Sequence, residues 1–133
     1  MSLKELMSES ELEELVNIPM GYGYTQGSPE LREKISSLYK GFDYKNVLVT
    51  SGSSEAIFLT ALLMLSEGDE LIMMSPNYLS INGIAKSIGA EVSFIALEED
   101  LGWSLDLDKL RNLVSKRTKL IFLSRTFLSP CMI

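Results

Sequence analysis

The chain has 133 residues, a net charge of −6 and 46% apolar residues, which is the composition of a single globular domain rather than of a disordered chain. Because the sequence contains no histidine, neither a Ser-His-Asp or Cys-His catalytic site nor a histidine-based zinc site can be assembled, and we expect no metal centre. The lysines and arginines are scattered and the net charge is negative, so we exclude nucleic acid as the main partner.

Cysteine usage and hydrophobicity indicate where the protein works. Cys131 is the single cysteine, so no intramolecular disulfide can form, which fits a reducing compartment. The first residues include acidic side chains and no apolar core, unlike a signal peptide. The longest apolar run, residues 56–65, is about half the length that spans a bilayer. We therefore expect a cytoplasmic protein without membrane contact.

The first 28 residues predict an acidic helix over 9–16, followed by an irregular arm rich in Gly and Tyr. Ser28, Pro29 and Glu30 then read as an N-cap, a proline in the first helical position and a carboxylate at the positive end of the helix dipole. We expect this helix to end at Gly41 and the main domain to comprise residues 29–133.

From residue 46 onward, short apolar runs alternate with segments of helical periodicity. Strands are predicted over 46–50, 70–74, 91–97 and 119–123, and helices over 54–66, over 79–88 up to Gly89, and after Asp106. This order predicts an α/β fold with a mostly parallel sheet and flanking helices. The helix over 54–66 is apolar almost all round, so we expect it to be buried.

Three segments have the residue types that bind ligands. Ser51, Gly52 and Ser53 lead from a predicted strand into a helix, where free N–H groups, hydroxyls and the helix dipole suit a phosphate. A serine-capped buried helix is the equally good alternative for this segment alone, and the P-loop motif is absent. Tyr22 lies in a Gly-rich segment that a flexible connection would explain, and Tyr78 follows a strand end, where an aromatic ring could stack on a planar heterocycle or simply pack in a proline turn.

Taken together and in order, the segments resemble a known family. The matching residues are Tyr22-x-x-x-x-Gly27-x-x-x-Leu31-Arg32, Ser51-Gly52-Ser53-x-Glu55-Ala56, Glu67-Gly68-Asp69-Glu70, Pro76-x-Tyr78 and Gly89-Ala90. This set resembles the class I/II aminotransferases, which are pyridoxal-phosphate (PLP) enzymes of fold type I, over about residues 20–124. The chain would then be part of the large, cofactor-binding domain of such an enzyme.

The resemblance implies a role for five residues. In this family the loop matching Ser51, Gly52 and Ser53 holds the phosphate of PLP, and the aromatic residue matching Tyr78 stacks on the pyridine ring. The tyrosine matching Tyr22 reaches the phosphate of the neighbouring subunit, which implies a homodimer for the full-length relative. The implied substrates are an amino acid and a 2-oxo acid, between which the family moves an amino group.

The resemblance weakens after Leu123. The Asn-Pro-Thr-Gly-like turn expected next is not present, and Ser129-Pro130 does not supply its asparagine. The family's Schiff-base lysine, the aspartate partner of the pyridine nitrogen and the arginine that binds the substrate carboxylate would lie beyond residue 133. We therefore expect a large domain truncated at its C-terminal end, assign no catalytic residue, and expect no activity from the chain alone.

Two other hypotheses stay open at this point. The chain could be a non-catalytic binding or assembly module that docks on a full-length homologue. It could also be an α/β domain that binds another phosphorylated ligand at Gly52 and Ser53, although such a domain would not need both Tyr22 and Tyr78.

Overall fold

The computed structural model describes residues 2–124, so the expectations about Ser129-Pro130 and Cys131 lie outside the described residues. The chain divides after Val49 into two compact units. The elements of the first unit are α1 (Leu3–Leu6), α2 (Glu9–Val16), α3 (Pro29–Ser36) and the 3-10 helix η1 (Tyr44–Asn46). Those of the second are α4 (Ser53–Met64), β1 (Glu70–Ser75), α5 (Ser80–Ile88), β2 (Glu91–Ala96), the 3-10 helix η2 (Glu99–Leu101), α6 (Leu107–Leu113) and β3 (Thr118–Phe122).

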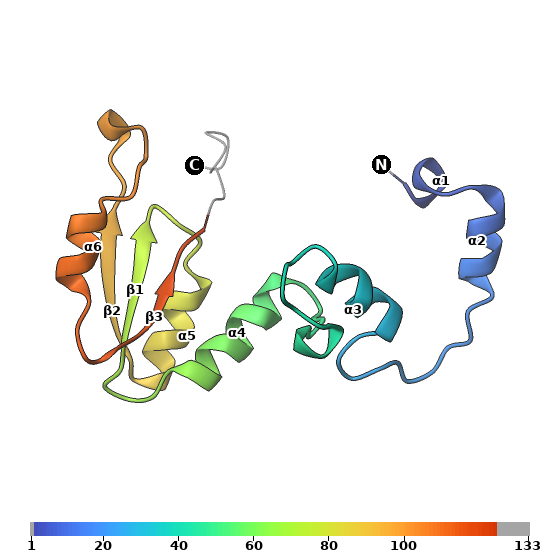
Figure 1. Cartoon of the computed structure of the whole chain (residues 1–133), viewed down its shortest axis with the longest axis horizontal. Helices are drawn as coiled ribbons and strands as arrows, with labels where there is room; N and C mark the ends of the chain where they lie inside the picture. Colours follow the sequence, from blue (N-terminus) through green and yellow to red (C-terminus); the bar gives the residue numbers. More distant parts are fainter. Residues whose placement is uncertain (1, 125–133) are drawn as a thin grey trace. The chain divides into compact units, whose positions relative to one another are not determined.

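The second unit is built on a parallel sheet with strand order β2-β1-β3, which confirms the predicted α/β fold (Figure 1). Each strand leads through a helix to the next strand, because parallel neighbours need a long crossover connection. The central strand β1 is buried at Leu71, Ile72 and Met73. This explains its continuous apolar sequence, since helices cover both faces of a parallel sheet.

The core lies between one face of the sheet and helices α4 and α5. Leu71 and Met73 point to this face, where they join Ile81 of α5 and Ala61 of α4, all at most 1% exposed. Side chains alternate along a strand, so Ile72 belongs to the opposite face, on the side that α6 covers. The sheet is therefore the middle layer of three (Figure 1).

The predicted strand over 46–50 is wrong. The segment is the end of η1 followed by irregular chain, and several of its backbone groups have partners within the first unit. The Val49 N–H donates to the Gln26 carbonyl at 3.0 Å, and the Val47 carbonyl accepts from Nε of buried Arg32 at 2.9 Å. With these groups paired outside a sheet, the apolar run does not need strand neighbours.

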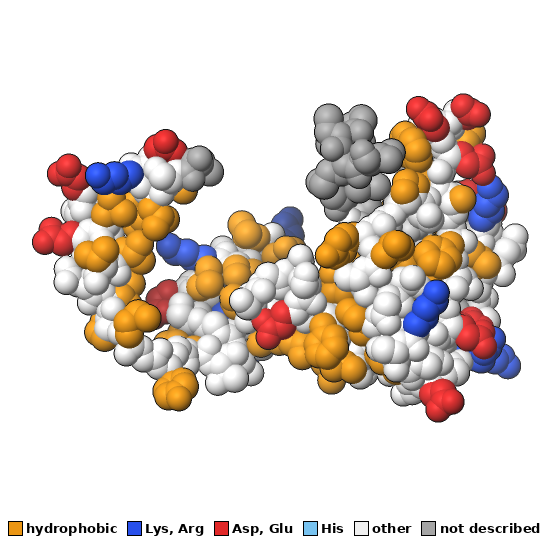
Figure 2. Space-filling view, turned by 180° about the vertical axis from the view of Figure 1, so that it is seen from behind, with side chains coloured by type: hydrophobic (Ala, Val, Ile, Leu, Met, Phe, Trp, Pro, Cys, Tyr) orange, Lys and Arg blue, Asp and Glu red, His pale blue; other side chains and the backbone are white. Residues whose placement is uncertain are grey.

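The predicted burial of the helix over 54–66 is also wrong. Within α4, Ala61 is fully buried, whereas Phe58 and Leu62 are about half exposed and Leu63 is 84% exposed. Ala61 and the partly buried Ile57 pack against the core, whereas Phe58, Leu62 and Leu63 face outward. Figure 2 shows apolar side chains reaching the surface of the second unit in several places.

A charged cluster connects the amino ends of the three strands. Glu70 accepts hydrogen bonds from the hydroxyls of Ser115, at 2.6 Å, and Thr118, at 3.2 Å, and pairs with Arg117 at 2.6 Å. Arg117 also pairs with Glu91 at 3.0 Å. The Ser115 hydroxyl, followed by Thr118 and Arg117, holds the pKa of the Glu70 carboxyl below its ordinary value, while partial desolvation acts in the opposite direction. The cluster lies beside the shift in register between β1 and β3.

In the first unit, α2 has the predicted bounds, and α3 starts at Pro29 as predicted but ends at Ser36, short of Gly41. Gly27 adopts a φ of 93°, and a Cβ at this position would lie 2.6 Å from the side chain of Val49. Glycine is therefore required here for both conformation and space. Among the described residues, no helix has the length and hydrophobicity to cross a bilayer.

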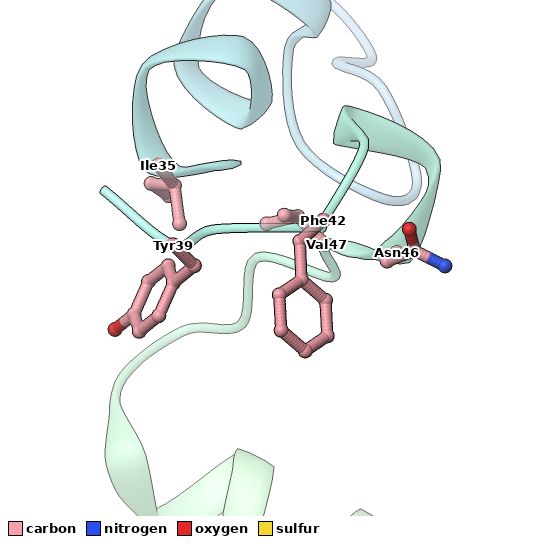
Figure 3. Close-up of a pocket in the computed structure, with 5 residues that line it drawn as sticks. All are labelled: Ile35, Tyr39, Phe42, Asn46 and Val47. Atoms are coloured by element: carbon pink, nitrogen blue, oxygen red, sulfur yellow. The ribbon is translucent and has the colours of Figure 1, made fainter. Parts of the chain in front are cut away.

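The first unit also has an apolar hollow of about 230 Å³, lined by Ile35, Tyr39, Phe42, Asn46 and Val47 (Figure 3). The rings of Tyr39 and Phe42 meet edge to face, with centroids 6.3 Å apart. None of the lining residues is a predicted site residue.

Candidate functional site

The segment Ser51–Ser53 forms an exposed corner at the start of α4, with Gly52 as the N-cap residue. Gly52 has φ 91° and ψ 169°, a combination that is essentially restricted to glycine. A Cβ built at Gly52 would meet no atom within 4 Å, so the space beside the backbone is open. A ligand can therefore approach the main chain at this position closely.

Three hydrogen bonds hold this corner in place. The Gly52 N–H donates to the Thr50 carbonyl at 2.8 Å, and the Thr50 hydroxyl donates to the Gly52 carbonyl at 2.9 Å. The Ser51 N–H donates to the carboxylate of Glu55 at 2.5 Å. The amides of Ser51 and Gly52 thus have internal partners, and the donors left to a ligand are those of the first turn of α4.

The first turn of α4 supplies the favourable electrostatics of the corner. N–H groups in a first helical turn lack intrahelical acceptors, and no side chain caps this helix. The helix dipole adds about half a positive charge at this end. No Lys or Arg occurs between Lys45 and Lys86, and Glu55 contributes a negative charge. The attraction for an anion therefore comes from the backbone and the serine hydroxyls.

Tyr78 lies on the connection between the carboxyl end of β1 and α5. Tyr78 is 67% exposed, and its backbone N–H donates to Oδ1 of Asn77 at 2.7 Å. Nδ2 of Asn77 and Oγ of Ser80, both on this connection or at the helix start, are buried without a hydrogen-bond partner in the described part of the chain. The ring of Tyr78 is available to a ligand, and polar groups next to it have unused bonding capacity.

The structure brings some of the five predicted site residues together and not others. Ser51, Gly52 and Ser53 are consecutive in the corner, and Tyr78 belongs to the same unit. Within residues 2–124, no hydrogen bond or ring contact joins Tyr78 to the corner. Tyr22 belongs to the first unit and is fully exposed.

Thr50 and Glu55 also hold the corner, although neither is among the residues predicted for the site. The signal for Glu55 was present in the sequence. A Glu three positions after an N-cap residue commonly reaches back to a free backbone N–H. Here the acceptor bonds the amide of Ser51, one residue before Gly52. For Thr50, a hydroxyl two residues before the N-cap gives no comparable signal.

Many proteins with a parallel α/β sheet bind phosphate groups at the N-terminus of a helix that follows a glycine-containing turn. Comparisons with known proteins identify the family. A model of the family "Aminotransferase class I and II" matches residues 9–127, and the chain therefore belongs to this family.

Individual relatives are aminotransferases as well. The chain is 34% identical over 110 residues to an aspartate aminotransferase of Sulfurisphaera tokodaii, covering 78% of this chain and 28% of that protein. It is 29% identical over 115 residues to the tyrosine aminotransferase of Homo sapiens, covering 84% of this chain and 25% of that protein. The chain thus spans about a quarter of the length of these relatives.

Solved structures agree with this fold. A PLP-dependent aminotransferase from Streptococcus suis superposes with a TM-score of 0.82 at 34% identity, over 91% of this chain and 34% of that one. The alanine aminotransferase from Pyrococcus furiosus gives a TM-score of 0.77 at 29% identity, over 85% and 30% of the two chains. The fold type I resemblance found in the sequence is confirmed, with the chain covering part of a domain.

The corner fits the phosphate of PLP, the cofactor that this family uses. The space beside Gly52 is open, and Ser51 and Ser53 are exposed. A phosphate dianion needs donors, and the first turn of α4 with its serines supplies them. The negative Glu55 carboxylate repels the phosphate dianion, but this carboxylate accepts a hydrogen bond from the Ser51 N–H.

Proposed function

We propose that this chain forms the phosphate-binding part of a PLP-dependent aminotransferase that moves an amino group between an amino acid and a 2-oxo acid. The observation that carries the proposal is the open corner at Gly52, placed at the start of α4 in a member of the aminotransferase family. We also propose residues 1–28 as an arm and residues 29–133 as the cofactor-binding part of the domain.

Each proposed site residue has one task. Ser51 and Ser53 donate their hydroxyls to the phosphate, and Gly52 lets the phosphate approach the first turn of α4. Tyr78 orients the pyridine ring by stacking, for which its exposed side chain is suited. When bound, PLP supplies the electron sink for amino-group chemistry. The residues of this chain therefore bind and orient.

Tyr22 is proposed to act in a neighbouring subunit. Its side chain is fully exposed, and the glycines on both sides of it have open space around them. An exposed tyrosine on such an arm is suited to reach the phosphate of a second copy, which makes a homodimer the proposed assembly of the full-length protein. The proposed location is the cytoplasm.

We further propose that these 133 residues alone do not turn over substrate. A lysine that binds the cofactor covalently needs a lowered pKa. Lys109 donates to Glu98 at 2.8 Å, and this hydrogen bond raises the pKa of its ammonium group. Lys86, Lys116 and Lys119 are exposed. The measurement is amino transfer from several amino donors, and turnover that disappears on substitution of one lysine would contradict the proposal.

A second candidate function is an assembly module that docks on a full-length homologue. The observation in its favour is the open apolar side of α4, where Leu63 is 84% exposed. Mixing the chain with a full-length aminotransferase and measuring the mass of the complex separates the two candidates. A complex that Leu63→Asp abolishes would favour the module.

Binding of pyridoxamine 5′-phosphate tests the main proposal. This compound has the phosphate and ring of the cofactor but no aldehyde, so surface lysines do not react with it. We expect weak binding that Gly52→Val reduces, because a branched side chain crowds the phosphate approach. The matched control is Ser37→Ala, on the exposed end of α3. Equal effects of the two substitutions would refute the site.

A further inference from the structure

Glu55 is the acidic residue closest in sequence to the proposed phosphate site, and it makes the 2.5 Å contact with the Ser51 N–H. A carboxylate next to a site for a dianion is unfavourable by charge alone. Its presence therefore needs a compensating role, and the contact with Ser51 suggests one.

We propose that Glu55 is the positioning residue of the phosphate-binding corner, a role that rests on the proposed function. By accepting the Ser51 N–H, its side chain fixes the residue that precedes Gly52. The Thr50 hydroxyl fixes the Gly52 carbonyl from the other side. Together these bonds hold the corner so that the first-turn N–H groups of α4 stay open to the ligand.

The two properties of Glu55, acceptor and charge, act on phosphate affinity in opposite directions. A unit charge about 6 Å from a dianion in water weakens its binding about tenfold, and physiological salt reduces this to about threefold. Loss of a positioning hydrogen bond weakens binding by about fivefold. Glu55→Gln removes the charge and keeps an oxygen acceptor, whereas Glu55→Ala removes both.

The variants should therefore differ. Glu55→Gln should bind pyridoxamine 5′-phosphate about threefold more tightly than the parent chain, and about fivefold more tightly than Glu55→Ala. The matched charge control is Glu67→Gln, which follows the other end of α4. That helix has 12 residues and is about 18 Å long, so Glu67 is more than a screening length from the corner. The affinity of Glu67→Gln for pyridoxamine 5′-phosphate should equal that of the parent chain.

Hydrogen exchange of the Ser51 amide reports on the Ser51–Glu55 hydrogen bond in the absence of any ligand. We expect slow exchange in the parent and in Glu55→Gln, and fast exchange in Glu55→Ala. A change confined to general helix stability would instead alter the exchange of the whole of α4 in both variants.

The experiment combines titration calorimetry with amide exchange on the parent chain, the two Glu55 variants and Glu67→Gln. Equal affinities of Glu55→Gln and Glu55→Ala would overturn the positioning role and leave Glu55 as a repelling charge. Equal Ser51 exchange in all variants would overturn the contact. No phosphate binding in any variant, with the Ser51 difference preserved, would refute the proposed function rather than the contact.

Discussion

Replacing Gly52 by alanine tests the backbone geometry on which the site depends. At φ 91° and ψ 169°, a residue with a side chain is strained by about 1–3 kcal/mol. No steric cost adds to this, because the new Cβ would meet no atom within 4 Å. Alanine also restricts the unfolded chain, which offsets about 0.4–1 kcal/mol. We expect Gly52→Ala to lower the free energy of unfolding by about 1–2 kcal/mol.

Gly83 provides the matched control, because it lies inside α5, has ordinary negative φ and has equally open space around its Cα. Gly83→Ala should raise the free energy of unfolding by about 0.5–1 kcal/mol. Urea unfolding followed by far-ultraviolet circular dichroism measures both changes. Equal changes of the same sign would refute the backbone conformation assigned to Gly52, and with it the reason for a glycine at the corner.

Three further substitutions probe the core, the strand ends and the ring site. Ile81 is 1% exposed, so Ile81→Ala should lower the free energy of unfolding by about 2–5 kcal/mol. Leu63→Ala should change the free energy of unfolding by less than about 0.5 kcal/mol. Similar losses for the two variants would mean that the Leu63 side of α4 is covered. Because the folded-state pKa of Glu70 is lowered, its stabilisation is present above pH 4.5 and is lost in acid as the pH falls through the lowered value. Glu70→Gln should therefore flatten acid unfolding curves, and an unchanged curve would contradict this. Tyr78→Ala should weaken binding of pyridoxamine 5′-phosphate about two- to tenfold and Tyr78→Phe should not, as calorimetry can measure.

Three helix boundaries, the starts of α3 and α6 and the end of α5, were predictable from sequence because their signals are local. Ser28 accepts from the Leu31 N–H, and Asp106 accepts from the N–H groups of Asp108 and Lys109, as an N-cap does. Gly89 ends α5 in the left-handed conformation. Each signal involves residues at most three positions apart, so no knowledge of tertiary contacts was needed.

Features that depend on distant partners were not predictable in this way. The apolar run through Val47 and Val49 resembles a strand, but Gln26 and Arg32 take its hydrogen bonds. Similarly, apolar composition cannot distinguish a covered helix from α4, in which Leu63 is open. Periodicity reports which residues prefer burial, whereas the available neighbours decide which residues achieve it.

The candidate site was predictable in part. The sequence predicted that Ser51, Gly52 and Ser53 lead into a helix, and Gly52 is indeed the N-cap residue of α4, whereas its positive φ was not predicted. The position of Glu55, three residues after the N-cap, signalled its bond to the Ser51 amide, but nothing in the sequence indicated that the Thr50 hydroxyl bonds the Gly52 carbonyl, because that bond depends on a side-chain rotamer.

The most direct test of the account is to map where pyridoxamine 5′-phosphate binds on the isotopically labelled chain by amide chemical-shift changes. The account predicts that the largest changes fall on Gly52, Ser53 and Ser54, with a second group at Tyr78. The same changes at Ser53 and Ser54, without those at Tyr78, should appear with inorganic phosphate. Changes that cluster on the first unit, or that spare the start of α4 at saturating ligand, would contradict the assignment of this corner as the phosphate site.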